Sequence, residues 1–96
     1  MRQRSNKVLS VSVTGMAVAI YSGGHPVMLR IEDVEFVVIC STKEKMEQVL
    51  AFAGITDAKI QQITDSNEFF DSVRGIRIML DPYIYNGNTR FTELHP

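Results

Sequence analysis

Apolar residues recur at every second position near the start of the chain. They occupy alternate places over residues 9–13, and after Gly15 the alternation resumes over residues 16–20. A period of two residues is typical of a strand that buries one face. We therefore expect a first strand before Gly15, a bulge or break at that glycine, and a continuation or second strand after it.

The next segment predicts two more strands. Residues 22–26 contain two glycines, a histidine and a proline, which indicates a turn. Residues 27–31 alternate again, so we expect them to pair with the strand before the turn as a hairpin. Residues 34–40 are nearly all apolar apart from Glu35. Such a run predicts a central strand, covered on both faces or covered by helices on one face and by a partner on the other.

A helix is predicted to follow this central strand. Ser41–Glu44 matches a capping box, in which the serine hydroxyl accepts a hydrogen bond from a first-turn amide and the glutamate reaches back to the cap. We expect the helix to begin at Thr42 and to end at Gly54, where a left-handed residue is favoured. An apolar stripe should face the sheet. It consists of Met46, Val49, Leu50 and Ala53.

The second half of the chain predicts a strand, a short helix and a terminal hairpin. Residues 58–63 have the pattern of an edge strand, and Asp65–Glu68 supply a second capping signal for a helix of two turns. Residues 76–80 alternate as a strand that stops or bends at Pro82. Asn86–Gly87 then favours the tight turn of a hairpin.

Together these elements predict an α+β fold, with a mainly antiparallel sheet of about five to seven strands and two short helices packed on one face. Hairpins at both ends of the chain are typical of a two-layer α+β sandwich rather than of a doubly wound parallel fold. No repeat or linker divides the sequence. We expect a single domain at residues 8–96, preceded by a flexible basic tail at residues 1–7.

The charge of the chain is unevenly distributed, and this bears on nucleic-acid binding. Three of the ten Lys and Arg residues lie in the first seven positions, which leaves seven against eleven Asp and Glu residues, or −4, for the rest. Proteins that bind nucleic acids generally present a basic face to the phosphates. We therefore expect no nucleic-acid binding by the folded body.

A secretory signal is an alternative interpretation of the first twenty residues. Basic residues precede an apolar stretch, and Ala17–Ala19 has the small residues of a cleavage site. The alternation of polar and apolar residues argues against it, since the apolar core of a signal peptide is continuous. Cys40 is the one cysteine, so no intrachain disulfide can form. We expect a cytoplasmic protein that does not enter a membrane.

The residues that commonly carry catalysis are few. Cys40 ends an apolar strand, which predicts a buried and inert thiol. His25 lies in a turn and His95 is the penultimate residue, so we expect both to be solvated rather than to act as bases. Asp81 and Glu93 could in principle act as acid and base, but charges at strand ends are usually solvated.

Metal and phosphate chemistry has no better support in the sequence. No Cys or His pair has the spacing of zinc ligands. Gly23–Gly24 lacks the lysine and the strand-to-helix context of a phosphate loop, and the amides at residues 42–44 offer only what every helix start offers. We therefore expect no enzyme activity, no cofactor and no metal.

The terminal hairpin is the most informative segment for binding. It brings Tyr83 and Tyr85 close to Arg90 and Phe91. Tyrosine and arginine are over-represented in binding hot spots, because a rigid ring contributes contact area at a low entropy cost. The alternative is that these four residues are cross-strand packing pairs within the hairpin.

Two short motifs carry a resemblance to a known family. An apolar strand runs into Ser-Thr-Lys-Glu-Lys-Met at residues 41–46, and Ile-Met-Leu-Asp-Pro follows at residues 78–82. Over residues 25–85 the chain thereby resembles the N-terminal domain of SseB-type proteins, which implies an α+β fold with no established catalytic activity and carries over no functional residue. The chain departs from that pattern in its first strands and in its Asn-Gly hairpin. Its small size and lack of motifs also make it similar to orphan proteins of bacterial mobile gene cassettes.

The function that we predict is a non-enzymatic protein-interaction module, a homodimer or higher oligomer, that self-associates through a sheet face or edge. Tyr83, Tyr85, Arg90 and Phe91 are the expected binding residues. We expect self-association because the strands have more apolar surface than two helices on one face can cover. The residues expected on the opposite face are Ala19, Met28, Val37, Ile39 and Met79.

Two other function classes remain open at this point. One is a small-molecule-binding domain, with a pocket between the sheet and the helix that carries Phe69 and Phe70 and with Tyr21 or Tyr83 as polar contacts. The other is an enzyme, for which the sequence proposes no mechanism.

Overall fold

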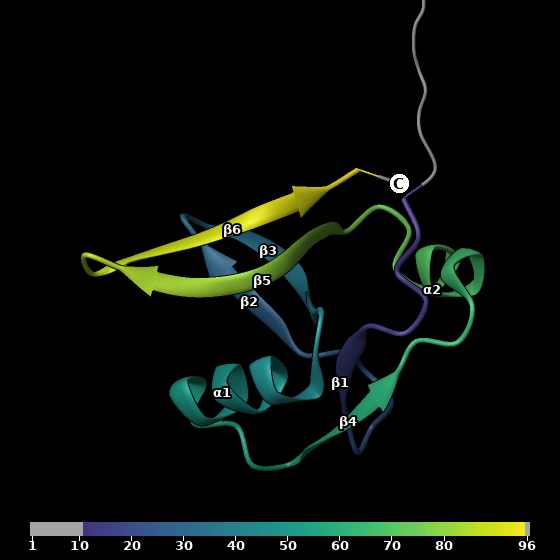
Figure 1. The fold of residues 1–96 in the computed structure, drawn as a ribbon, viewed down its shortest axis with the longest axis horizontal. Helices are drawn as coiled ribbons and strands as arrows, with labels where there is room; N and C mark the ends of the chain where they lie inside the picture. The colour runs from purple at the N-terminus through teal and green to yellow at the C-terminus, as the bar shows by residue number, and fades with distance from the viewer. Residues whose placement is uncertain (1–10, 96) are drawn as a thin grey trace, which may run out of the picture.

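A computed structural model describes residues 11–95, and the predicted basic tail at residues 1–7 lies outside this range (Figure 1). The order of elements is a strand-rich start, a helix, a strand, a helix and a terminal hairpin, as predicted. The fold class α+β is therefore confirmed. The elements are β1 (Ala17–Tyr21), β2 (Met28–Ile31), β3 (Val34–Cys40), α1 (Lys43–Ala53), β4 (Ala58–Gln62), α2 (Ser66–Ser72), β5 (Arg77–Tyr85) and β6 (Asn88–Leu94).

The six strands form one sheet with the order β4-β1-β3-β5-β6. β2 lies off this path and pairs with residues 34–37 of β3, whereas β1 pairs with residues 39–40 of the same strand. The sheet is mixed, so the prediction of a mainly antiparallel sheet is wrong. The difference lies at the centre, where β3 and β5 run parallel. Parallel neighbours need a long crossover. Here the segment with α1, β4 and α2 supplies the crossover. The prediction failed because the pattern of apolar residues in a strand does not show the direction in which its neighbour runs.

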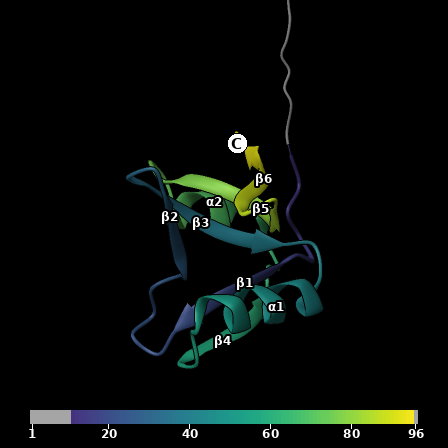
Figure 2. The same ribbon diagram turned by 90° about the vertical axis from the view of Figure 1, so that its left-hand side faces the viewer.

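The two helices contribute to different core clusters on opposite faces of the sheet, so the prediction that they pack on one face is also wrong (Figures 1 and 2). Successive side chains of a strand point to opposite faces. Val38 of β3 packs in the cluster that contains Met46 and Leu50 of α1. Its neighbour Ile39 packs in the cluster that Phe69 and Phe70 of α2 contact.

As a result, the apolar sheet face that was expected to need a partner is already covered. Val37 and Ile39 are 0% exposed, and they lie under α2 and the segment around Val13. Ala19 and Met79 are equally buried, on the α1 side. Apolar residues that we assigned to one bare face are thus divided between two covered ones.

The first predicted strand is absent from residues 11–13, while Leu9 lies outside the described residues. Val13 is nevertheless fully buried. The amides of Val13 and Thr14 donate hydrogen bonds to the Ser66 hydroxyl, at 2.8 and 3.0 Å, and the Gly15 amide donates to the Ile63 carbonyl. The segment therefore satisfies its backbone at the start of α2 rather than in the sheet.

The expected hairpin between β1 and β2 is also different in the structure. β2 pairs with β3 instead, through a turn at Glu32 and Asp33, whose φ angles are 50° and 67°. Positive φ at both central residues is the geometry of the two-residue hairpin turn, and Asp33 tolerates it better than most residues because its short polar side chain can bond to the nearby backbone. Between β1 and β2 the structure has only an isolated bridge, from Ile20 to Pro26.

The helix ends follow the sequence closely. Asp65 caps α2 by accepting a hydrogen bond from the Glu68 amide, as predicted. Gly54 ends α1 with a φ of 72°, also as predicted. The cap of α1 is shifted by one residue, because Thr42 rather than Ser41 accepts from the first-turn amide of Lys45.

The strand β5 continues beyond Pro82 but bends there. Leu80 pairs with Thr92 and Tyr83 with Arg90, so Asp81 and Pro82 together face Phe91 in a β-bulge. The turn at Asn86 and Gly87 has φ angles of 51° and 78°, which confirms the predicted tight hairpin.

The outer half of this hairpin projects from the rest of the molecule. β3 pairs with β5 only as far as Leu80. Residues 81–91, which we call the arm, therefore form a two-stranded ribbon. It extends past α1 and the β2–β3 turn at the left of Figure 1.

Candidate interaction surface

The structure separates the four residues that were predicted to bind. Tyr83 pairs with Arg90, and Tyr85 pairs with Asn88 two positions further along the ribbon. Cross-strand partners share a face, and alternate residues of a strand share it as well. Tyr83, Tyr85 and Arg90 therefore lie on one face of the arm. Phe91 lies on the other face, toward α1.

The face with the two tyrosines is open to solvent. Tyr83 is 57% exposed and Tyr85 is 51% exposed. The Arg90 guanidinium lies 4.8 Å from the centre of the Tyr85 ring, which is a cation–π distance. This contact holds both side chains in place, so less side-chain entropy would be lost on binding a partner. We call Tyr83, Tyr85 and Arg90 the tyrosine face.

Phe91 has a packing role. Its ring meets the buried Phe36 ring edge to face, with 5.0 Å between the ring centres. The Arg77 guanidinium lies 4.9 Å from the centre of the same Phe36 ring. The alternative prediction, a packing role, therefore fits Phe91. This residue anchors the base of the arm to the core.

The outer edge of β6 adjoins the tyrosine face. Within the described residues β6 pairs with β5 alone, so one row of its backbone groups has no strand beside it. Such an edge is a template for another strand. β6 carries no proline, and it includes two threonines and a phenylalanine, which suit a strand.

A groove of about 990 Å³ lies between the arm, α1 and β2, and Tyr83 and Arg90 of the tyrosine face are part of its lining. α2, beside which we expected a small-molecule pocket, contributes no residue to it. Sequence reasoning missed Phe52, which lines the groove and is 77% exposed. The available signal was a phenylalanine next to the apolar stripe of α1 rather than in it. Apolar residues of the lining include Leu29, Ile31, Val49, Phe52, Ile84 and Phe91.

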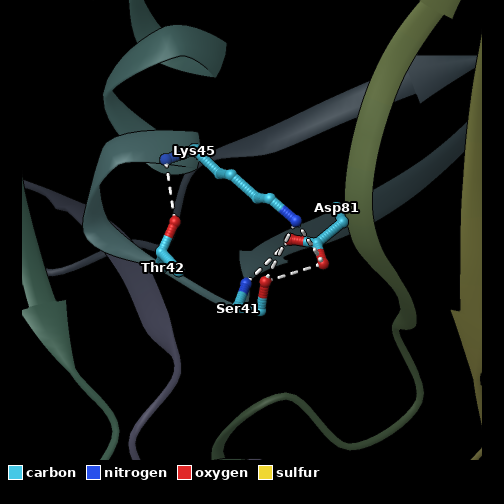
Figure 3. Close-up of polar contacts among 4 residues, drawn as sticks. All are labelled: Ser41, Thr42, Lys45 and Asp81. Carbon is cyan, nitrogen blue, oxygen red and sulfur yellow. Dashed lines mark hydrogen bonds and ion pairs between the residues drawn. The ribbon is translucent and has the colours of Figure 1, made fainter.

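A polar cluster fixes the base of the arm to the beginning of α1 (Figure 3). The Asp81 carboxylate accepts hydrogen bonds from the Ser41 amide at 2.7 Å and from the Ser41 hydroxyl at 2.9 Å. Lys45 Nζ lies 3.6 Å from Asp81 Oδ2 and donates to the Ser41 hydroxyl at 3.4 Å. Ser41 is thus occupied by the bulge, which explains why Thr42 caps the helix.

The two carboxylates considered as an acid and base pair have separate partners. Asp81 is engaged by Ser41 and Lys45, whereas Glu93 accepts two hydrogen bonds from Arg77, at 2.6 and 2.7 Å. Hydrogen bonding to Arg77 lowers the pKa of Glu93, and the positive charge of Arg77 acts in the same direction. The contacts with Arg77 favour the ionised form of Glu93, and both carboxylates have structural partners.

Cys40 is fully buried, as predicted. Burial is the largest cause that raises the pKa of its thiol, to about 11, and the nearby Asp81 charge raises it further, while Lys45 opposes the shift. A nucleophilic cysteine needs the opposite environment, which stabilises the thiolate. The thiol is therefore neutral at physiological pH.

Histidines and metal ligands do not gather at any of these surfaces. His25 and His95 are both exposed. Within residues 11–95, no group of three or more His, Cys, Asp or Glu side chains is arranged to hold a metal ion. The helices of the same range are too short or too polar to cross a membrane.

Comparison with known proteins returns no relative. No protein-family model, no curated protein and no solved structure matches this chain. The resemblance to SseB-type domains therefore stays a prediction, and functional argument rests on the surfaces above.

Proposed function

We propose that this chain is a non-enzymatic protein-interaction module that forms a homodimer through the open edge of β6 and the adjoining tyrosine face. The observation that carries the proposal is the exposure of Tyr83 and Tyr85 on a projecting ribbon, in a molecule whose sheet faces are covered by its own helices. A sheet edge, rather than a sheet face, is then the surface left for self-association.

Pairing of two β6 strands gives a symmetric arrangement. An antiparallel pair of identical edges is related by a two-fold axis, so each copy uses the same residues and the assembly closes at two chains. Backbone hydrogen bonds alone bury little area, whereas a stable interface covers roughly 800 Å² on each partner. Tyr83 and Tyr85 supply large rings close to the same edge, which suits them to extend the contact.

The proposed setting is the cytoplasm of a bacterium, and the partner is a second copy rather than nucleic acid. The support is the single buried cysteine and the charge of −4 outside the first seven residues, from seven basic and eleven acidic side chains.

Sedimentation velocity of the 96-residue chain tests the proposal. We expect a species of twice the 10.8 kDa chain mass at micromolar concentration. Tyr85→Ala should weaken the dimer at least tenfold, and Tyr85→Phe, which keeps the ring, should weaken it less than threefold.

A second variant tests the edge itself. The two-residue turn places Thr89 opposite Ile84 in a pair without mutual hydrogen bonds, so the Thr89 amide points outward. Thr89→Pro removes that donor and should dissociate the dimer while circular dichroism stays unchanged. A wild-type chain that is monomeric at several hundred micromolar would refute the proposed function.

A further inference from the structure

We propose that the groove between α1 and the arm is a second binding site, which takes a short acidic peptide segment with apolar anchor residues. The groove shares Tyr83 and Arg90 with the tyrosine face, but its lining also includes Ile84 and Thr89, which form the next cross-strand pair, and it does not include Tyr85. The two proposals therefore share part of the arm, and they are distinguished by Phe52 and Arg30, which only the groove contains, and by Tyr85, which only the tyrosine face contains.

Exposed apolar side chains are concentrated at this groove. Five large apolar residues are exposed among the described residues, and three of them, Phe52, Tyr83 and Ile84, line the groove. Phe52 comes from α1 and Ile84 from the arm, so the two border the groove from different elements. Exposed apolar groups that face a common groove are anchors for the side chains of a partner.

The charges around the groove differ from those of the rest of the molecule. Its lining includes three of the seven basic side chains in residues 11–95, namely Arg30, Lys45 and Arg90, but only one of the eleven carboxylates, Asp81. Asp81 is already held by Ser41 and Lys45. The lining is therefore positive in a body that is negative overall, which favours an acidic ligand.

The shape of the groove favours a peptide over a small molecule. Its volume of about 990 Å³ is at the upper end of small-molecule sites, which enclose most of the ligand surface. This groove is open along one side, so it would leave a compact ligand largely in water. A peptide can run through such a groove, with apolar side chains inward and carboxylates toward the arginines.

A second copy of the chain is a poorer occupant. The arm is the segment that could reach into a neighbouring groove, but its one carboxylate, Asp81, is held at its base by Ser41 and Lys45, and the rest of it, residues 82–91, contains Arg90 and no Asp or Glu. Insertion of one arm would add positive charge to a positive lining. Charge complementarity thus favours a different protein as the source of the peptide.

Selection from a phage-displayed library of random nonapeptides against the 96-residue chain tests the site. We expect enriched peptides to combine Asp or Glu with Leu, Ile or Phe. Fluorescence polarisation with the most enriched peptide should show at least a tenfold loss of affinity for Phe52→Ser and for Arg30→Glu.

Arg74→Glu is the matched control for charge reversal. Arg30 and Arg74 are both exposed arginines that pair with an exposed carboxylate, Glu35 at 3.4 Å and Asp71 at 2.7 Å, but Arg74 does not line the groove. Arg74→Glu should change peptide affinity less than twofold. Tyr85→Ala, which weakens the proposed dimer, should also leave peptide affinity within twofold of wild type, so the two proposals fail separately.

Four results would overturn this inference. The first is a library that enriches no peptide or only neutral and basic peptides, and the second is an equal loss of peptide affinity for Arg30→Glu and Arg74→Glu. The third is dissociation of a dimer by Phe52→Ser. The fourth is a small molecule that native mass spectrometry detects on the wild-type chain and that Phe52→Ser removes. The third result would assign the groove to a second copy, and the fourth to a metabolite.

Discussion

The two halves of β5 are both rich in apolar residues, but one half is buried and the other is exposed. Residues 77–80 lie between β3 and β6, and Ile78 and Met79 are buried there. Among the described residues, β6 is the one strand that pairs with residues 83–85, and Ile84 is 47% exposed. Both halves are rich in apolar residues, so their neighbours and not their own pattern decide what is buried. The inner half supports stability, and the outer half belongs to the surfaces for which we propose contact with other molecules.

A matched pair of substitutions on β5 gives the largest expected effect. Ile78→Ala should lower the free energy of unfolding by about 2–5 kcal/mol, because it leaves a cavity in a packed core. Ile84→Ala, the same chemical change six residues closer to the tip of the hairpin, should lower it by less than about 1 kcal/mol. Urea denaturation measures both. Equal losses would mean that the arm is as firmly packed as the sheet.

The bulge that separates the two halves gives the next effect. Asp81 has a φ of 50° and accepts two hydrogen bonds from Ser41. Asp81→Ala should lower the free energy of unfolding by about 1–3 kcal/mol, since it removes a charged acceptor and places alanine at a positive φ. Asp81→Asn tolerates that φ and keeps an acceptor, so it should cost less. A cost below about 0.5 kcal/mol for Asp81→Ala would show that the bulge holds its shape without this cluster.

Alkaline pH probes the inner region through Cys40. The pKa of its thiol is raised from 9.0 to about 11 by burial, so above pH 9 the unfolded chain loses this proton while the folded chain keeps it. Stability should then fall between pH 9 and 11, by on the order of 1 kcal/mol at pH 10. Cys40→Ala should show a flatter profile than wild type over that range when urea midpoints are compared. Identical slopes would place the thiol in contact with water.

Acidic pH probes the edge strand and gives the smallest effect. Because hydrogen bonds from Arg77 lower the pKa of Glu93 below 4.5, its contribution to stability is present above that pH and is lost as the pH falls through the lowered value. Glu93→Gln should therefore reduce the loss of stability below pH 4.5. Glu35→Gln, at a more exposed pair, is the control and should change this acid limb less.

Local signals in the sequence predicted the elements well. Asp65, Gly54 and the Asn86–Gly87 turn are short-range devices, and each acts in the structure as predicted. The bend at Pro82 was also predictable, since proline cannot donate to the ladder in the middle of a sheet. These features depend on residues within a few positions of one another.

Long-range arrangement could not be predicted in the same way. The apolar run of β3 was compatible with two covered faces or with one covered face and a partner, and the choice depends on where α2 packs. Pairing of β2 with β3, rather than β1, depends on a Glu32–Asp33 turn that has no glycine. The exposed Phe52 became a candidate only once the arm was seen to leave it uncovered.

The parallel pairing of β3 with β5 has a consequence for the kinetics of folding. Each paired residue, such as Phe36 with Arg77, lies 41 positions from its partner, because 77 minus 36 is 41. The β5–β6 hairpin closes over two residues and can form within about 1–10 μs, whereas contacts of high sequence separation form slowly. We expect the arm to be structured before the sheet that carries it. Docking of this hairpin onto β3 should then be the step that limits the folding rate.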